Sequence, residues 1–270
     1  MRQEPPTPFD PVFLRTVNSQ VIETDGVVRA AYVRADGELV FVLDDNSGTG
    51  GQIKVKTQAL STPWSAVTGS PTGSLSFTVS DPASGFSGID FNAAGTRMFL
   101  FNHDSTKVYY VDTMTPWSFS SATLSSFVLP TSSLSLTDSP FYIFDETGAY
   151  SYANAVGFVD RVVRLQSNSA FDPDDTGTTT TTNFTSDIGG GASIQVRSFA
   201  ESGTYMYGNV FSSIRRWTLS TPYDLNTKSN MRSSLDFSSS FYGFKTDPTG
   251  TKALAYDSNT EQLVSYSMGV

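Results

Sequence analysis

Residues 89–101 read Ile89-Asp-Phe-Asn-Ala-Ala-Gly95-Thr-Arg-Met-Phe-Leu-Phe101, an apolar strand, a polar turn ending in glycine, and a second apolar strand. A tight hairpin needs a residue at positive φ, which glycine adopts without steric cost, so Gly95 predicts a hairpin. The same pattern recurs around Gly37, Gly148, Gly203 and Gly250. These five glycines are 58, 53, 55 and 47 residues apart. The chain is therefore a degenerate repeat of about 50 residues.

A second landmark follows the hairpin in three of the five repeats. It reads Leu60-Ser-Thr-Pro-Trp64, Met114-Thr-Pro-Trp117 and Leu219-Ser-Thr-Pro-Tyr223. Proline fixes φ and ends a strand, while the aromatic ring can pack against the sheet. The third repeat offers only a weaker match, Ser169-Ala-Phe171-Asp172, and a further strand such as Leu75–Val79 comes after the landmark. Four short strands at this period are typical of a β-propeller blade.

The two ends of the chain set the number of blades. The fifth repeat ends after its third strand, residues 262–267, while a spare strand, residues 12–17, precedes the first full blade near Val27. An open ring would leave unpaired strand edges, so we expect the spare strand to pair with the segment around 263–267. The sequence thus predicts an all-β, five-bladed β-propeller closed by an N-terminal strand that completes the last blade. An irregular β-sandwich is the alternative.

The predicted domain organisation is one propeller preceded by a short arm. Residues 1–11 are rich in proline and form an extended arm, and residues 12–270 form a single domain. The expected blades comprise residues 27–80, 81–130, 131–190, 191–238, and 239–270 together with 12–17.

Composition excludes several classes of function. The chain has no cysteine, which excludes disulfides and thiolate–zinc sites. Its net charge is -9 and its 17 basic residues are scattered, so we expect no nucleic-acid partner. The N-terminal residues lack the apolar core of a signal peptide, and no apolar run is long enough to span a membrane.

The residue types that could carry chemistry are few. His103 is the only histidine, and its place between two strands predicts an exposed turn residue rather than a catalytic or metal-binding one. A glycoside hydrolase would need paired carboxylates near the inner strands, and the candidates are Asp90, Asp145 and Asp247. Asp145 and Asp247 belong to hairpin turns, where aspartate is common, and the face of the strand on which Asp90 lies is open. We therefore predict no catalytic residues.

Three loop segments are compositionally unusual. Asp172–Gly177 and Asp44–Gly48 resemble calcium loops in composition but lack their regular ligand spacing, so we expect turns and neither metal nor cofactor. The threonine-rich tract Thr176–Asn183 is either a ligand-contacting surface loop or the β-prone fourth strand of the third blade. We favour the strand.

Taken together, the second repeat carries four recognisable motifs: Gly95-Thr-Arg-Met-Phe99, Lys107-Val-Tyr-Tyr110, Thr115-Pro-Trp117 and Ser121-Ala-Thr123. This repeat resembles the β-propeller repeat of bacteriophage tail and tail-fibre proteins, and the resemblance covers nearly the whole chain after Val27. The third blade departs from it by lacking the Pro-Trp step, and the fourth by having tyrosine for tryptophan.

The resemblance implies a non-enzymatic structural or binding component of a virion, on a tail, a tail fibre or the capsid surface. It implies several copies per assembly, with other virion proteins as partners. The extended arm, residues 1–11, is a separate hypothesis for where those partners dock. A host-surface glycan or receptor is a further expected partner. Because bacterial surface proteins carry similar blades, a bacterial surface interaction module is one alternative, and a carbohydrate-active hydrolase that uses the central funnel is another.

Overall fold

The structure of the chain is a computed structural model, and only some of its residues are described below. They comprise residues 14–22, 24, 26–45, 51–81, 83–105, 107–118, 124–128, 142–155, 158–172, 176–188, 192–210, 213–233, 241–248 and 250–268. The arm predicted for residues 1–11 lies outside these ranges.

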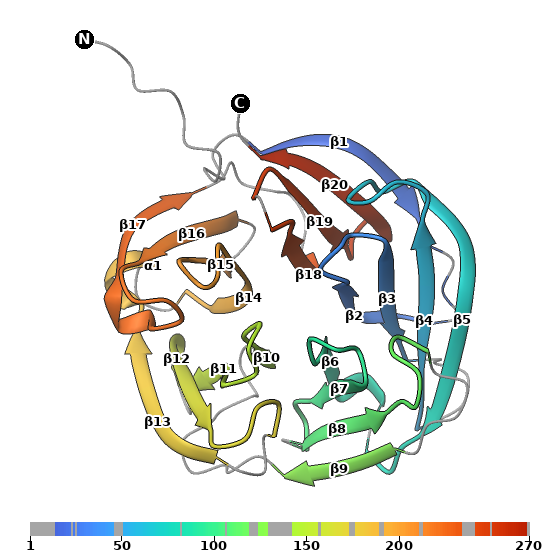
Figure 1. The fold of residues 1–270 in the computed structure, drawn as a ribbon, viewed down its shortest axis with the longest axis horizontal. Coiled ribbons are helices and arrows are strands. Elements are labelled where there is room, and N and C mark those ends of the chain that lie inside the picture. The colour runs from blue at the N-terminus through green and yellow to red at the C-terminus, as the bar shows by residue number, and fades with distance from the viewer. Residues whose placement is uncertain are drawn as a thin grey trace.

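The described strands form five four-stranded antiparallel sheets arranged around a central axis (Figure 1). From the axis outward, blade one consists of β2 (Val28–Val33), β3 (Leu39–Asp44), β4 (Gln52–Leu60) and β5 (Thr68–Thr78). Blade two consists of β6 (Phe86–Phe91), β7 (Arg97–Asn102), β8 (Lys107–Asp112) and β9 (Leu124–Val128). Blade three consists of β10 (Tyr142–Phe144), β11 (Tyr150–Ala155), β12 (Phe158–Ser167) and β13 (Thr176–Asn183).

The last two blades follow the same order. Blade four consists of β14 (Ile194–Ala200), β15 (Tyr205–Val210), β16 (Ser213–Leu219) and β17 (Lys228–Ser233). Blade five consists of β18 (Phe241–Thr246), β19 (Lys252–Asp257), β20 (Gln262–Met268) and β1 (Leu14–Val21). Helical turns occur at η2 (Ala83–Gly85), α1 (Thr185–Ile188) and η3 (Leu225–Thr227). No helix in the described ranges is long and apolar enough to cross a membrane. The predicted five-bladed propeller is confirmed.

The ring closes where the sequence predicted. Strand β1 pairs antiparallel with β20, from Leu14 opposite Met268 to Val21 opposite Gln262. The closing strand thus runs farther than the predicted residues 12–17, and its first two predicted residues lie outside the described ranges. The side chain of Asn18 also ties β1 to blade one, because its Nδ2 donates to Ser65 Oγ and its Oδ1 accepts from Ala66 N, both at 2.9 Å. Closure therefore joins the last blade to the first.

In the first four repeats the two sequence landmarks meet in space and form one unit, here called the glycine–aromatic clasp. In blade two, Gly95 has φ +68 in the β6–β7 turn, and the N–H of Trp117 donates to its carbonyl at 2.9 Å. A Cβ on Gly95 would lie 2.1 Å from the Trp117 ring, so the ring covers the glycine face. Glycine is thus required both for its φ and for its missing side chain. The clasps pair Gly37 with Trp64, Gly95 with Trp117, Gly148 with Phe171, and Gly203 with Tyr223.

Blade three shows that the proline is not essential to the clasp. Phe171, the weaker sequence match, has φ +56, and its N–H donates to the Gly148 carbonyl at 2.9 Å, as in the other clasps. In blade five, Gly250 takes the same turn conformation with φ +64, and the residues after β20 lie outside the described ranges.

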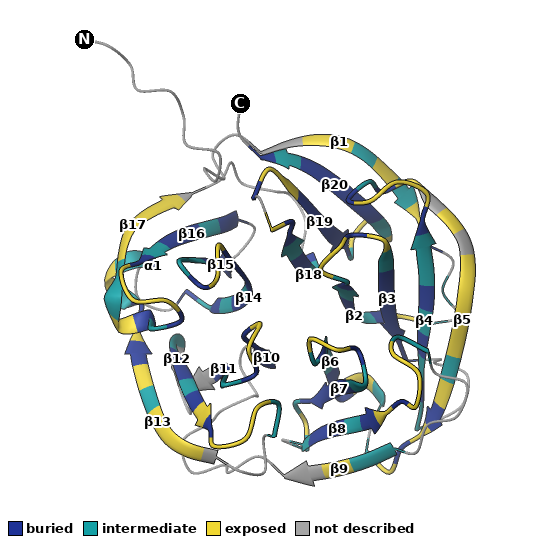
Figure 2. Cartoon of the chain, in the orientation of Figure 1, coloured by how far each residue is buried: buried dark blue, intermediate teal, exposed yellow. Residues whose placement is uncertain are grey.

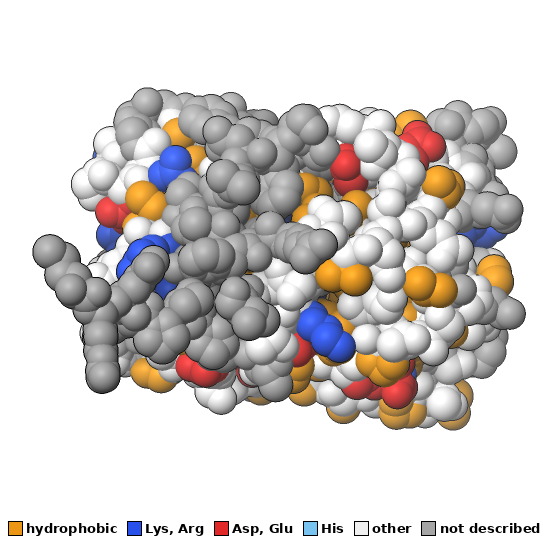
Figure 3. All heavy atoms as spheres, turned by 90° about the horizontal axis from the view of Figure 1, so that it is seen from above, with side chains coloured by type: hydrophobic (Ala, Val, Ile, Leu, Met, Phe, Trp, Pro, Cys, Tyr) orange, Lys and Arg blue, Asp and Glu red, His pale blue; other side chains and the backbone are white. Residues whose placement is uncertain are grey.

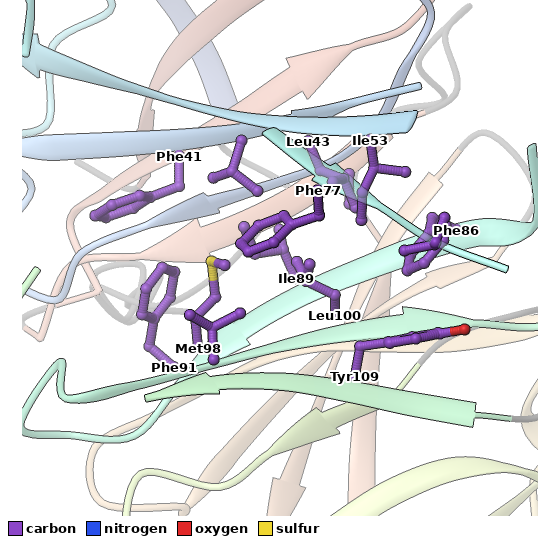
Figure 4. Packing of buried hydrophobic residues seen from close by; sticks show 14 residues of the cluster. Phe41, Leu43, Ile53, Phe77, Phe86, Ile89, Phe91, Met98, Leu100 and Tyr109 are labelled. Carbon is purple, nitrogen blue, oxygen red and sulfur yellow. The ribbon is translucent and has the colours of Figure 1, made fainter. Parts of the chain in front are cut away.

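The core lies between the blades. The second strands β3, β7 and β19 are buried at nearly every position, because each blade is covered by a neighbour on both faces. Figure 2 shows exposed residues gathered on outer strands such as β5 and β13. Figure 4 shows the cluster between blades one and two, with labelled members from blade one (Phe41, Leu43, Ile53, Phe77) and from blade two (Phe86, Ile89, Phe91, Met98, Leu100, Tyr109).

Edge-on, the described lysine and arginine side chains lie in small separate groups on the visible face (Figure 3). This distribution agrees with the scattered basic residues of the sequence, and the expectation of no nucleic-acid partner stays a prediction.

Candidate functional site

The inner strands β2, β6, β10, β14 and β18 surround a narrow space on the propeller axis, here called the channel (Figure 1). One residue from each inner strand lies at the same place, five residues before the turn glycine of its blade. These equivalent residues all line the channel, and they are Tyr32, Asp90, Ile143, Ser198 and Lys245. Each blade therefore contributes a different side chain to one ring of five positions, here called the channel ring.

The channel widens into a hollow at the end that carries the glycine turns, here called the mouth. The mouth has a volume of about 240 Å³ and is lined by both turn residues and strand ends. Trp117 and Phe171, the rings of two clasps, form part of its wall, and both are half-buried. The exposed side chain of Glu146 lies where the mouth meets the channel, because it lines both spaces.

Asp90 is the carboxylate of the channel ring. Its Oδ1 accepts a hydrogen bond from Phe91 N and its Oδ2 accepts one from Phe144 N, both at 2.8 Å, so it links blade two to blade three. Burial raises its pKa to about 6, against the opposing influence of the Lys245 charge and of these two amides. Asp90 thus changes protonation in a range where an ordinary aspartate is fully ionised.

Lys245 is the cation of the same ring. Its Nζ lies 5.9 Å from the centre of the Tyr32 ring, within the distance for a cation–π contact. Among the described residues it forms no ion pair, and its charge acts on Asp90 from across the channel. Burial, together with the nearby Asp90 charge, raises the pKa of Tyr32, so this phenol stays protonated.

Two of the predicted carboxylates line the mouth and are engaged in its turns. Asp145 Oδ1 accepts from Tyr150 N at 3.2 Å, and its Oδ2 accepts from the Thr147 hydroxyl at 2.7 Å. Asp247 Oδ1 accepts from Lys252 N at 3.0 Å in the same way. Both residues line the mouth, and burial raises the pKa of Asp145. The prediction that Asp145 and Asp247 serve the hairpin turns is confirmed. For Asp90 the sequence left open which face of the strand it occupies, and in the structure its side chain lies in the channel.

His103 lies in the β7–β8 turn, as predicted, but it is half-buried rather than exposed. The turn packs against η2, where the backbone His103 N donates to Gly85 O at 2.8 Å. Its Nε2 lies 3.2 Å from Asp104 Oδ1. Because successive hairpins of a blade alternate between its two ends, His103 lies at the end opposite the mouth.

The segments considered as calcium loops are only partly described. Asp45 has a structural role, since its Oδ1 accepts from Val27 N at 3.0 Å and its Oδ2 pairs with Arg29. Residues 46–50 and 173–175 lie outside the described ranges. Within those ranges, no three His, Asp or Glu side chains gather as a metal site would need. Thr176–Asn183 is strand β13, so the favoured interpretation of this tract is confirmed.

Four other side chains of the channel were not recognised from the sequence as candidate site residues, and they are Tyr32, Lys245, Arg197 and Glu146. A signal for two of them was present, since Tyr32 and Lys245 stand the same five residues before a turn glycine as Asp90 does. Strand alternation sends such equivalent positions to the same side of each blade.

No protein-family model and no curated protein matches this chain. Solved structures do match it. One is glutaminyl cyclase from Myxococcus xanthus, with a TM-score of 0.58 and 9% sequence identity over 95% of this chain and 97% of that one. Another is the β-propeller domain of Cps50 (Swd1) from Myceliophteria thermophila, with a TM-score of 0.46 and 10% identity over 94% of this chain and 99% of that one. At such identities the likeness to the cyclase concerns the fold alone. The expectation that this chain is not an enzyme stays a prediction.

Proposed function

We propose that this chain is a non-enzymatic binding component of a bacteriophage virion, and that the channel mouth binds one sugar residue of a host-surface glycan. The observation that carries the binding site is the mouth itself, a hollow that joins aromatic walls to charged groups from different blades. Ligand sites are concave and largely apolar, with a few polar groups that fix the ligand's orientation. The mouth has this composition.

The dimensions and chemistry of the mouth suit a saccharide. Its volume of about 240 Å³ is below the range of drug-sized pockets, and so fits one small ring rather than an extended ligand. A sugar presents an apolar C–H face, which packs on rings such as those of Trp117 and Phe171. Its hydroxyls can donate to Glu146 and accept from Lys245, which both line the hollow.

The virion location is supported by the resemblance of the repeat to those of tail and tail-fibre proteins. A rigid ring that presents a small binding site at one end suits a particle surface, where many copies raise a weak single-site affinity through multivalency. In this proposal the arm, residues 1–11, docks the propeller to other virion proteins, which leaves the mouth free.

A second candidate function is a hydrolase at the same mouth, and one observation favours it. Asp90 has a pKa of about 6, in the range of a general acid, and Glu146 lines the same channel. The architecture can carry an enzyme, since glutaminyl cyclase has this fold. We rank binding first because both oxygens of Asp90 accept backbone hydrogen bonds, as expected for a structural carboxylate.

Glycan arrays and saturation-transfer NMR with the full chain test the binding site. We expect Glu146→Gln and Lys245→Gln each to weaken binding of the selected sugar roughly fivefold to tenfold, because each removes one charged hydrogen-bonding group. Lys252→Gln, an exposed lysine of the same blade outside the mouth, is the matched control and should bind like wild type. Binding that survives both mouth variants would place the site elsewhere, and sugar cleavage during the assay would favour the hydrolase.

Mass spectrometry of purified virions tests the location independently. The chain should be present in several copies per particle, and particles assembled with a chain that lacks residues 1–11 should have lost it. Absence of the full chain from particles would contradict the virion assignment without affecting the binding site.

A further inference from the structure

Arg197, in strand β14, is a cation inside the channel without a counter-ion. Its Nη2 donates to the carbonyl of Phe241 at 3.1 Å and to Gln195 Oε1. Its Nε is buried and has no hydrogen-bond partner, and among the described residues Arg197 forms no ion pair. Burial lowers its pKa to about 10, so it remains charged at neutral pH. A buried charge that is not paired is strongly unfavourable.

Other guanidinium groups of the molecule show how this cost is normally met. Arg29 pairs with Asp45, and Arg97 forms a two-pronged contact with Asp112. Arg216 is an exception: it is buried more deeply than the half-buried Arg197, forms no ion pair among the described residues, and has no hydrogen-bond partner at Nε or Nη1. It stacks on the Tyr205 ring with its Cζ 4.8 Å from the ring centre, and it lines none of the cavities described. Arg197 differs from Arg29 and Arg97 because it has no acidic partner, and from Arg216 because it lines a cavity.

The cavity beside Arg197 offers further hydrogen-bond donors. It has a volume of about 50 Å³, and since one water needs roughly 10–15 Å³, it can hold a small ion. Ser87 Oγ, on strand β6, is a second buried polar atom of this lining without a partner, and Lys245 lines the same space. The carboxylate oxygens of Asp90, in the channel ring, already accept hydrogen bonds from the backbone N–H groups of Phe91 and Phe144.

We propose that the channel below the mouth is an anion site, in which a small anion accepts hydrogen bonds from Arg197 Nε and Ser87 Oγ and neutralises the guanidinium. The anion is either a free inorganic ion or the carboxylate of an acidic sugar that reaches in from the mouth. Both sources present the same anionic chemistry to the site. The proposed site depends on Arg197 and does not depend on glycan binding at the mouth.

Bromide tests the free ion. Crystals of the full chain grown in sodium bromide should show an anomalous peak between the side chains of Arg197 and Ser87. In solution, sodium chloride should raise Tm by on the order of 3 °C over sodium isethionate, whose anion is a bulky sulfonate, at equal ionic strength, because a ligand that binds only the folded state stabilises it. Arg197→Met should abolish this difference, whereas Arg97→Met, which removes a surface guanidinium, should retain it.

Glucuronate and glucose separate the two sources of the anion. If the sugar carboxylate is the natural ligand, glucuronate but not glucose displaces bromide from the channel and raises Tm. If Arg197→Met fails to fold, Ser87→Ala and the bromide peak in the wild-type chain decide the matter. Absence of an anomalous peak, together with equal Tm values in chloride, isethionate and glucuronate, would overturn the proposal.

Discussion

The glycine–aromatic clasps and the channel ring lie only a few residues apart in each blade, yet they follow opposite rules. The clasp is built from the same kinds of residue in each of the four blades where it is described, as in Gly95 with Trp117. The channel ring has five different side chains at five equivalent positions, from Tyr32 to Lys245. The clasp repeats from blade to blade, whereas the channel ring does not.

The difference shows where a repeat protein is free to vary. Every blade must turn between its first and second strands, and an aromatic side chain over the glycine stabilises that turn locally, so the clasp recurs in each of the four blades where it is described. The channel exists once, so its ring of residues can differ from blade to blade without cost to the repeat. Unequal side chains at equivalent positions, such as Asp90 and Lys245, therefore point to function.

The largest expected effect is at a clasp. Gly95→Val should lower the free energy of unfolding by about 3–5 kcal/mol, because a β-branched residue is strained at φ +68 and its Cβ would overlap the Trp117 ring. Urea unfolding followed by tryptophan fluorescence measures the change. The control is Gly73→Val on the exposed strand β5, where a Cβ meets nothing within 4 Å, and its effect should stay within about 0.5 kcal/mol. Equal losses in both variants would refute the clasp.

The next largest loss of stability is expected when the aromatic residue of the same clasp is replaced. Trp117→Ala should cost about 2–3 kcal/mol, since the ring is half-buried and packs on Phe91 with ring centres 5.1 Å apart. In that background Gly95→Ala should become cheaper by about 1 kcal/mol, because only the strain at positive φ remains. A double-mutant cycle measures this coupling. Met114→Ala, at an exposed neighbour, is the control, and purely additive losses would show that ring and glycine act independently.

A smaller effect is expected at the channel, and it depends on pH. The folded-state pKa of Asp90, about 6, lies above that of an unfolded aspartate, so the folded chain binds the proton more tightly. The contribution of Asp90 to stability therefore falls as pH rises from about 4 to 6, by about 1–2 kcal/mol. The measurement is the difference in unfolding free energy between wild type and Asp90→Asn at pH 4 and pH 7. If that difference is the same at both values, Asp90 does not titrate in this range.

The smallest effect on stability should come from Lys245→Gln. Because its ammonium forms no ion pair among the described residues, we expect a change within about 0.5 kcal/mol, even though the same substitution weakens the proposed sugar binding. Thermal unfolding measured beside the binding assay shows whether the two effects separate. A loss as large as that of a clasp variant would remove the contrast between the clasp and the channel ring.

Much of the fold could be predicted from local sequence. The turn glycines, the aromatic landmark and the missing last strand gave the number of blades and the closure, because hairpin turns and strand counts depend on neighbouring residues. The weak sequence match at Phe171 could be assigned as the aromatic landmark of blade three because of its position in the same repeat. The extra length of β1 beyond residue 17 was not predicted, since it depends on pairing with a strand at the far end of the chain.

The candidate site was predicted only in part. Asp90 was named as a candidate, but its face was open, and the identity of its neighbours Lys245 and Arg197 was missed. These three residues come from different blades and are far apart in the sequence, so no local pattern joins them. His103 was placed correctly in its turn, but it is half-buried rather than exposed, and its turn bonds to Gly85 in a separate segment.

The sequence by itself determined the repeat, the hairpins and the five-fold ring, because these follow from φ preferences and strand periodicity within about 50 residues. Only the tertiary structure decided which side chains share the axis. The burial that shifts the pKa of Asp90, and that leaves Arg197 charged without an acidic partner, arises when five blades close around one channel. Desolvation is a property of that closed space, and no single repeat contains it.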